Sequence, residues 1–270
     1  MSRRRIQLCA DDYGFDRAIS LGILDCIDAG VVTATSCMVL SPAWPHWAPA
    51  LKERGAQADL GLHLDLNEFA HYASRSLKGW LLAAYRGAVP QALAAPWIES
   101  QLDAFERRIG RAPDYVDGHQ HLHQIPGVRE AVLQVLTRRY GHACALRITC
   151  SRHWRGAKAA LIGRLGGRAL AAGARAEGLR VNRDFAGVYD FEPATDYRER
   201  LEAWLRSLPE GGLMMCHPGR AGSTETRADG IRAARVNEHA VLAGGQALGL
   251  LQSLDIEPGR CRDWDVAGPD

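Results

Sequence analysis

Apolar segments of strand length alternate with amphipathic segments of helix length along the whole chain of 270 residues. Apolar or β-branched runs predict strands, and apolar residues at helical spacing predict helices. The predicted strands cover residues 5–10, 31–40, 58–66, 114–123, 143–149 and 212–219, and the predicted helices cover residues 16–30, 46–55, 97–110, 127–141, 196–211, 232–244 and 245–254. This alternation predicts an α/β fold, an irregular TIM-like (β/α) barrel of mostly parallel strands. In such a fold the active site lies at the C-terminal ends of the strands.

The chain is long enough, and at 47% hydrophobic residues apolar enough, to bury one sizeable core, so we expect a single domain over residues 1–270. A formal net charge of +2 gives no reason to expect nucleic acid as a partner. The seven cysteines are odd in number and include no Cys-x-x-Cys pair, which argues against a disulfide framework or a structural zinc site. The sequence has neither the apolar core of a signal peptide near its start nor a run of about 18 apolar residues. We therefore expect a cytoplasmic protein without a membrane span.

Four of the predicted strands end in side chains suited to metal binding or acid–base chemistry. These are Asp11 and Asp12, His63, the polar side chains of residues 117–123, and His217. An extended backbone over residues 117–123 would place one acid and three imidazoles on one face, because side chains alternate along a strand. The four residues of that face are Asp117, His119, His121 and His123. Because a barrel gathers its strand ends, we expect all these groups to converge.

A divalent cation would explain why two adjacent carboxylates stand at the end of the first strand. Carboxylates a few ångströms apart raise one another's pKa, and a cation between them removes that repulsion. One aspartate can then be a ligand while its neighbour stays free as a base. Two imidazoles and one carboxylate leave coordination positions open, which is typical of catalytic rather than structural metal sites.

Each of these features also has a purely structural interpretation. The pair Asp11 and Asp12 can be a loop or helix cap, and His63 can be a hydrogen-bonded core histidine. The histidines of residues 119–123 can form a solvated edge, and His217 can belong to a turn. The coincidence of all four at strand ends favours a functional site.

Five short motifs follow one another along nearly the whole chain. They are ADDYG at residues 10–14, GLHLDL at 61–66, DGHQHLH at 117–123, LRI at 146–148 and MCHPG at 215–219. In order and spacing this set resembles the YdjC family, also called the ChbG/HpnK family, of metal-dependent carbohydrate deacetylases. The resemblance implies an N-deacetylase that hydrolyses the linear amide of an N-acetylated sugar, in an oligosaccharide or a glycolipid, and releases acetate.

By this resemblance Asp12, His63 and His119 are the ligands of one divalent metal ion. Asp11 is then the general base that takes a proton from the attacking water, and His217 protonates the departing amine. Relatives are described with magnesium, although zinc, cobalt or manganese suits two imidazole ligands at least as well.

The remaining candidates have a supporting or substrate-facing role. They are Asp117, His121, His123, Arg147, Tyr13 and Trp80. Arg147 can orient Asp11, hold a substrate oxygen or form a salt bridge within the barrel. Tyr13 stands where many relatives have Phe, and we expect its hydroxyl to lie near the base. Trp80 belongs to a predicted loop over residues 69–96, whose aromatic rings can stack on a pyranose ring or pack in the core.

Basic residues are concentrated between residues 138 and 183, where Glu177 is the one acidic residue. Around residues 153–178 the pattern predicts a basic helical insertion with an apolar stripe formed by Leu161, Leu165 and Leu170. It can be a solvated helix packed on the barrel. Alternatively it approaches an anionic glycan, a lipid-linked sugar phosphate or a membrane surface, which would give peripheral contact with a lipid-linked substrate.

Two other functions are compatible with the same residues. A metal-dependent phosphoesterase also uses Asp and His clusters at a barrel mouth, often with two or three metals. A non-catalytic sugar-binding protein is the other alternative, although it gives no reason for a free Asp11 beside a full ligand set. The sequence leaves the sugar and the oligomeric state open, and exposed barrel helices are compatible with a homodimer.

Overall fold

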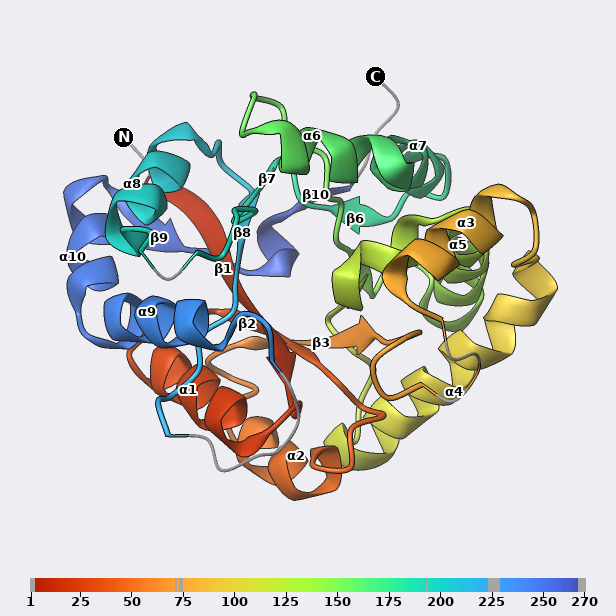
Figure 1. The fold of residues 1–270 in the computed structure, drawn as a ribbon, viewed down its shortest axis with the longest axis horizontal. Coiled ribbons are helices and arrows are strands. Elements are labelled where there is room, and N and C mark those ends of the chain that lie inside the picture. Colours follow the sequence, from red (N-terminus) through yellow and green to blue (C-terminus); the bar gives the residue numbers. More distant parts are fainter. Residues whose placement is uncertain (1–2, 71, 73–74, 193, 223–228, 267–270) are drawn as a thin grey trace.

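The computed structural model of the protein describes residues 3–70, 72, 75–192, 194–222 and 229–266 (Figure 1). Its strands form one curled sheet, in the order β10-β6-β5-β4-β3-β2-β1-β8-β7. Strand β9 pairs with the N-terminal end of β1, at residues 4–6. The strands are β1 (Arg4–Tyr13), β2 (Ala34–Cys37), β3 (Asp59–Leu64), β4 (Tyr115–Gly118), β5 (Ala145–Leu146), β6 (Arg180–Val181), β7 (Phe185–Ala186), β8 (Gly212–Cys216), β9 (Ile256–Pro258) and β10 (Asp265–Val266). Neighbouring strands are parallel except for β10 and β6, which are antiparallel.

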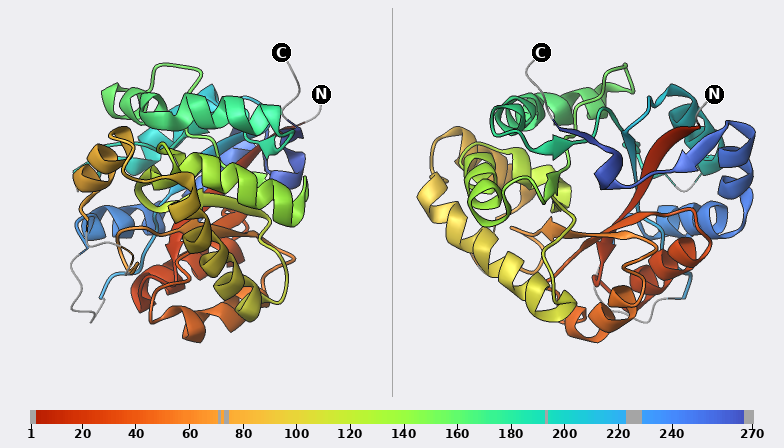
Figure 2. Two further views of the ribbon diagram at one scale, coloured as in Figure 1. Left: turned by 90° about the vertical axis from the view of Figure 1, so that its right-hand side faces the viewer. Right: turned by 180° about the vertical axis from the view of Figure 1, so that it is seen from behind.

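Helices cover the outside of this sheet, as the side and rear views show (Figure 2). They are α1 (Arg17–Asp28), α2 (Trp44–Lys52), α3 (Leu77–Tyr85), α4 (Gln91–Ile109), α5 (Val128–Tyr140), α6 (Ala157–Ile162), α7 (Arg168–Ala176), α8 (Tyr197–Ser207), α9 (Arg232–Ala243) and α10 (Gln246–Ser253). Three short segments are η1 (His119–Gln124) and η3 (Cys261–Asp263), both 3₁₀ helices, and η2 (Gly163–Gly167), a π-type turn.

The predicted α/β fold with mostly parallel, barrel-like strands is confirmed, and its irregularity lies between β6 and β7. In the part of the chain that the structure describes, no ladder joins these two strands, so the sheet curls around the site without closing. The segment α6–η2–α7 lies beside this seam, at the top of Figure 1. Residues 153–178 are thus largely helical, and their status as an insertion in a single domain remains a prediction.

Capping residues explain where two of the helices begin. The Asp16 carboxylate accepts a hydrogen bond from the Ile19 N–H at 2.7 Å and starts α1 directly after the first strand. Ser76 caps α3 in the same way, through the N–H of Gly79 at 3.2 Å. The prediction of a loop over residues 69–96 is wrong for α3 and for residues 91–96, which begin α4. A polar cap is a weaker sequence signal than a long apolar period.

The prediction of one extended strand over residues 114–123 is also wrong. Strand β4 ends at Gly118, and the chain then turns into η1, where Gln120 and His121 have left-handed backbone angles, φ 51° and 60°. Alternation of side chains therefore stops at Gly118. The histidines that follow do not share a face with Asp117, and each has its own environment.

Candidate active site

A β-bulge at the end of β1 brings Asp11 and Asp12 to the same place. Between Ala10 and Tyr13 the register against β2 shifts by one residue, and Asp12 takes a left-handed conformation with φ 74°. In a regular strand two adjacent side chains would point to opposite faces. Here both carboxylates line one pocket at the C-terminal ends of the strands, and both are 2% exposed.

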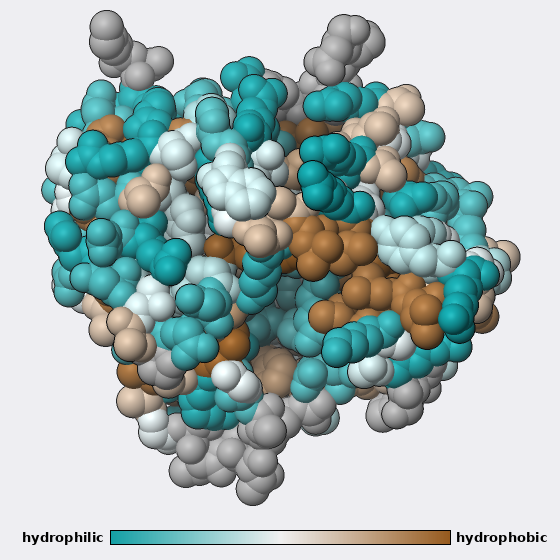
Figure 3. All heavy atoms as spheres, turned by 45° about the horizontal axis from the view of Figure 1, so that its top comes forward, coloured by the Kyte–Doolittle hydropathy of each residue, from teal (hydrophilic) through white to brown (hydrophobic). Residues whose placement is uncertain are grey.

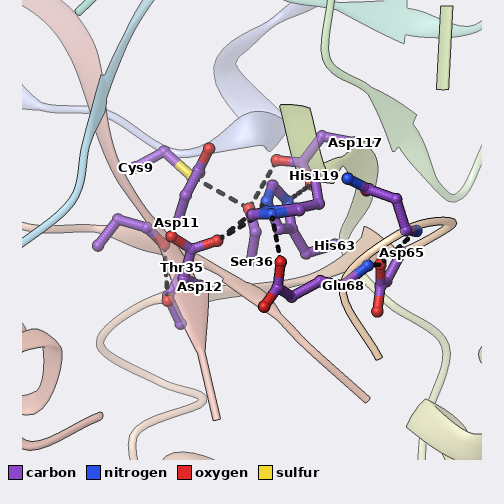
Figure 4. A network of polar contacts seen from close by, with 12 residues as sticks. Cys9, Asp11, Asp12, Thr35, Ser36, His63, Asp65, Glu68, Asp117 and His119 are labelled. Carbon is purple, nitrogen blue, oxygen red and sulfur yellow. Dashed lines mark hydrogen bonds and ion pairs between the residues drawn. The ribbon is translucent and has the colours of Figure 1, made fainter. Parts of the chain in front are cut away.

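Asp12, His63 and His119 form a cluster in which one donor atom of each lies within 4.8 Å of the others. Oδ1 of Asp12 is 3.4 Å from Nε2 of His63 and 3.1 Å from Nδ1 of His119. The two imidazole rings stand nearly perpendicular, with centroids 5.5 Å apart. The three predicted metal ligands therefore come together from β1, β3 and η1 (Figure 4).

Asp117 supports His63 from the side away from this cluster. Its Oδ1 lies 2.6 Å from Nδ1 of His63, which leaves Nε2 directed at Asp12. Burial by itself lowers the pKa of His63, but the surrounding carboxylates, Asp117 foremost, raise it to about 10. The buried carboxylate oxygens around His63 therefore create a negative electrostatic potential that favours binding of a cation.

Arg147 holds Asp11 with both arms of its guanidinium. Nη1 and Nη2 each donate to one oxygen of Asp11 at 2.7 Å, and Nη2 also lies 2.7 Å from Oδ2 of Asp117. Arg147 is fully buried. Burial alone raises the pKa of Asp11, but the Arg147 charge and hydrogen bonds, together with His63, hold that pKa below its usual range. The structure thus shows the predicted salt bridge within the barrel, and the same contacts are compatible with Arg147 orienting Asp11.

Around this arginine lies a further group of polar side chains from neighbouring strands. Cys9 and Ser36 lie 2.8 and 3.3 Å from Nη2 of Arg147, and Ser36 donates to Asp117 at 2.6 Å. Tyr115 Oη lies 2.9 Å from both Cys9 and Ser36. Burial raises the pKa of Cys9 to about 12, so its sulfur remains a thiol.

Arg235 and Glu238, from the buried face of α9, also belong to the site and were not identified from the sequence. Nη2 of Arg235 donates to Oδ2 of Asp12 at 2.6 Å, on the side opposite the histidines. Burial opposes ionisation of Asp12, yet Arg235 and His119 hold its pKa well below the usual range. Arg235 and Glu238 stand three positions apart on the helix face that also carries the apolar Ala234, Val241 and Leu242. Two charged residues on an apolar helix face are the sequence signal that would have identified them.

His217 lies at the end of β8, lines the same pocket and packs edge-on against Phe191. Its backbone N–H donates to the buried carboxylate of Glu238, which also accepts from the Tyr189 hydroxyl at 2.7 Å. Nδ1 of the ring has no hydrogen-bond partner among the described residues. Burial lowers the pKa of His217 to about 4, so the ring is neutral near pH 7.

The other two histidines of the DGHQHLH motif have separate positions. His121 lines the pocket and packs edge-on against Phe185. His123 is fully buried beneath it, with Nε2 3.2 Å from the Arg147 carbonyl, and burial lowers its pKa to about 4. Of the pair, only His121 can face a substrate.

Two predicted substrate contacts are corrected by the structure. Tyr13 is fully buried, and its hydroxyl donates to the Trp47 carbonyl at 2.9 Å rather than lying near Asp11. Trp80 is also fully buried and packs edge-on against Trp97. Neither lines the pocket, because both rings are large apolar groups that the core accommodates.

The pocket above these residues has a volume of about 670 Å³, and much of its wall is aliphatic. From α3 and from α6 with η2 come Leu77, Leu81, Leu161, Ile162 and Leu165. Figure 3 shows the hollow, with hydrophobic side chains along its rim.

Among the described residues, no helix is long and apolar enough to cross a membrane.

Comparison with known proteins gives matches of three kinds. A model of YdjC-like proteins matches residues 5–253. A carbohydrate deacetylase of Mus musculus is 33% identical over 151 residues, which are 50% of this chain and 47% of that protein. A chitooligosaccharide deacetylase of Enterobacter sp. (strain 638) is 30% identical over 138 residues, 48% of this chain and 54% of that protein. The chain thus spans about half the length of the curated relatives it matches.

Two solved structures support the fold. A protein of Enterococcus faecalis V583, described as a candidate cellobiose-phosphate cleavage protein, superposes with a TM-score of 0.72 at 19% identity and covers 97% of this chain and 98% of its own. A family 4 acetyl xylan esterase of Clostridium thermocellum, in complex with a cobalt ion, has a TM-score of 0.50 at 11% identity, with 96% and 89% covered. At these identities the likeness concerns the fold alone. The match over residues 5–253 is what assigns the family: the chain belongs to the YdjC-like proteins.

Proposed function

We propose that the protein is a metal-dependent N-deacetylase of an amino sugar, which hydrolyses the acetamide to a free amine and acetate. One observation carries the proposal: the cluster of Asp12, His63 and His119 lies at the bottom of a pocket beside Asp11, a carboxylate outside that cluster. The names of relatives, carbohydrate deacetylase and chitooligosaccharide deacetylase, agree with it.

The residues present fit one divalent cation. One carboxylate and two imidazoles supply three donors, and Asp117 fixes the orientation of His63. When bound, such a cation polarises the acetamide carbonyl and lowers the pKa of a nearby water. Magnesium is expected from the family resemblance, whereas the donor set suits zinc, cobalt or manganese, and cobalt is the ion in the esterase neighbour.

Asp11 and His217 divide the proton transfers between them. Asp11, held in place by Arg147, accepts a proton from the attacking water. His217 is neutral in the resting site, so the proton that Asp11 takes from water must pass to His217 before it reaches the departing amine. The attacking water releases one proton and the departing amine takes up one, so the reaction needs no external acid. His121 and Arg235 also line the pocket and can contact substrate oxygens.

The structure does not favour a phosphoesterase with two or three metals. The second group of potential ligands in the described chain consists of Cys9, Asp11 and Asp117. The Arg147 guanidinium already lies against all three of these residues, at 2.7 to 2.8 Å. A fixed positive charge between the donors opposes a second cation there.

The aliphatic walls favour a glycolipid over a free oligosaccharide as the substrate. Leucine and isoleucine side chains offer no hydrogen bonds to sugar hydroxyls, and burial of an alkyl chain against them stabilises a complex by about 0.8 kcal/mol per methylene. At about 670 Å³, the pocket has the usual volume for a drug-sized ligand, so it can hold a sugar together with a group attached to it. We propose that this attached group is apolar. Peripheral contact with lipid is part of the same proposal.

Acetate release from a panel of N-acetylated sugars tests the reaction. We expect turnover that disappears on chelation and returns with one added divalent cation. Phosphate release from matched phosphomonoesters is measured in parallel. Undiminished acetate release from a protein shown to be metal-free would exclude the mechanism, and phosphate release without acetate release would exclude the deacetylase.

A variant of the pocket wall tests the apolar group. Leu161 is 55% exposed on α6 at the pocket rim, and Leu161→Gln is expected to raise KM for an octyl N-acetylglucosaminide several-fold while leaving N-acetylglucosamine unaffected. Leu248→Gln, at an exposed leucine of α10 outside the pocket, is the control. An equal effect of Leu161→Gln on both substrates would argue against an apolar group in this part of the pocket.

A further inference from the structure

A second cavity lies against α6 on the face opposite the catalytic pocket. Lys158, Leu161 and Ile162 of this helix line the catalytic pocket, whereas Ala159 and Ala160 line the second cavity. Its volume is about 220 Å³, and the preceding loop, residues 150–155, forms the other wall. One short helix therefore separates the two spaces.

Positive charge dominates the lining of this cavity. Four arginines contribute to it, and no lining residue is acidic; the arginines are Arg152, Arg155, Arg164 and Arg168. Arg155 forms a salt bridge with the buried Asp184. For the other three, the described part of the chain provides no ion pair. The cavity thus keeps an excess of about three positive charges within a small space.

Arg155 makes this a built site rather than a loose surface cluster. Its side chain is 6% exposed, and its Nη atoms contact Asp184 at 3.0 and 2.9 Å. Nη2 also donates to Ser207 at 3.1 Å. The remaining donor, Nε, is buried and has no acceptor within the described residues. Arg155 thus gives the cavity one wall that the fold holds in place.

We propose that this cavity binds a phosphate group. Guanidinium forks match two phosphate oxygens at once, and several arginines around one small cavity are the arrangement that recognises such an anion. Trp154, 78% exposed at the rim, offers a flat apolar surface to whatever carries the phosphate. The group can come from free phosphate or a sugar phosphate, or from an anionic lipid headgroup. The proposal does not depend on the deacetylase reaction.

Occupancy of the cavity would also act on the catalytic pocket. Arg164 and Arg168 stand at either side of Gly166, whose φ of 108° belongs to the irregular turn of η2. Leu165, in the same turn, lines the catalytic pocket. An anion that contacts both arginines fixes this turn and with it one wall of the catalytic pocket.

Calorimetric titration of the intact protein with inorganic phosphate tests the site. Wild type should bind, and the double variant Arg164→Gln/Arg168→Gln should bind at least about tenfold more weakly, because it loses two charge-assisted contacts to the anion. Arg107→Gln/Arg108→Gln, at two exposed arginines of α4, removes the same charge elsewhere and should bind like wild type. All variants change exposed side chains, and thermal unfolding verifies that each is folded.

Vesicles distinguish the two sources of phosphate. Cosedimentation with phosphatidylglycerol vesicles, but not with phosphatidylcholine vesicles, that is lost in Arg164→Gln/Arg168→Gln alone would assign the site to a lipid headgroup. Phosphate binding with the same dependence, without vesicle binding, would assign it to a soluble phosphate. If the double variant binds phosphate and anionic vesicles as the wild type does, or if the wild type binds neither, the proposal is overturned.

Discussion

Asp12 combines a left-handed backbone with the central position of the proposed metal cluster. Its φ of 74° is uncommon for residues other than glycine, although Asp and Asn tolerate it better than most. The conformation is part of the bulge that aims both aspartates into the pocket. Backbone strain at such a position is typical of a site that the surrounding structure holds in place.

Asp12→Asn separates the charge of this residue from its conformation. Asparagine accepts the same backbone angles but supplies a neutral, weaker ligand, so we expect metal affinity to fall by more than about 100-fold, the upper end for loss of a supporting partner. Titration calorimetry with the activating metal measures this. Asp255→Asn, at another aspartate with positive φ that pairs on the surface with Arg3, is the control. Retained affinity in Asp12→Asn would remove Asp12 from the ligand set.

At the scale of elements, the site depends on how closely β3 and β4 approach. Gly61 of β3 lies under the ring of Tyr115, and a Cβ there would come within 2.3 Å of that ring. The absence of a side chain allows Tyr115 to reach across to Cys9 and Ser36. The space that Gly61 leaves free therefore allows Tyr115 to take part in the polar group around Arg147.

Gly61→Ala should destabilise the fold by about 1–3 kcal/mol, the usual range for overpacking a well-packed core. Urea denaturation at constant metal concentration measures the change in the free energy of unfolding. Gly249→Ala in α10 is the matched control, because a Cβ there meets nothing within 4 Å and alanine favours a helix by about 0.5–1 kcal/mol. Equal stability of Gly61→Ala and wild type would mean that Tyr115 can move without cost.

Sequence patterns predict elements well where one period runs uninterrupted. Strands β1, β3 and β8 and helices α1, α5 and α9 lie where the patterns place them, and the proposed ligands Asp12, His63 and His119 do converge. The pattern fails at Gln120 and His121, because left-handed residues interrupt a run that looks extended. It also cannot show that Asp11 and Asp12 share one side, since that depends on a bulge. Arg235 was missed because its contact with Asp12 spans 223 residues.

At the scale of the whole molecule, buried ionisable groups link stability to pH. Burial raises the pKa of Glu238 from 4.5 to about 7, against hydrogen bonds from the His217 N–H and the Tyr189 hydroxyl. The folded state therefore holds a proton that the unfolded chain releases above about pH 4.5. The resulting contribution to stability is fully present below pH 4.5 and is lost as pH rises to about 7.

Glu238→Gln removes this dependence. Between pH 4.5 and 7 the difference in the free energy of unfolding between wild type and variant should shift by up to about 3 kcal/mol, in favour of the variant as pH rises. Chemical denaturation at a series of pH values measures it. The difference isolates Glu238, because His123 and His217 act equally in both proteins. Glu257→Gln, at an exposed glutamate of β9, should show no such trend. A difference that does not vary with pH would contradict the assignment.

Arg147 supplies a permanent cation from within the chain, and this bears on the order of assembly. It joins the ends of β1, β4 and β5 through its ion pairs with Asp11 and Asp117. Part of the buried negative charge is therefore compensated as soon as these strands come together. If the proposed cation is required for activity, the protein can fold before that ion is bound. Metal supply would then control when the protein works rather than whether it folds.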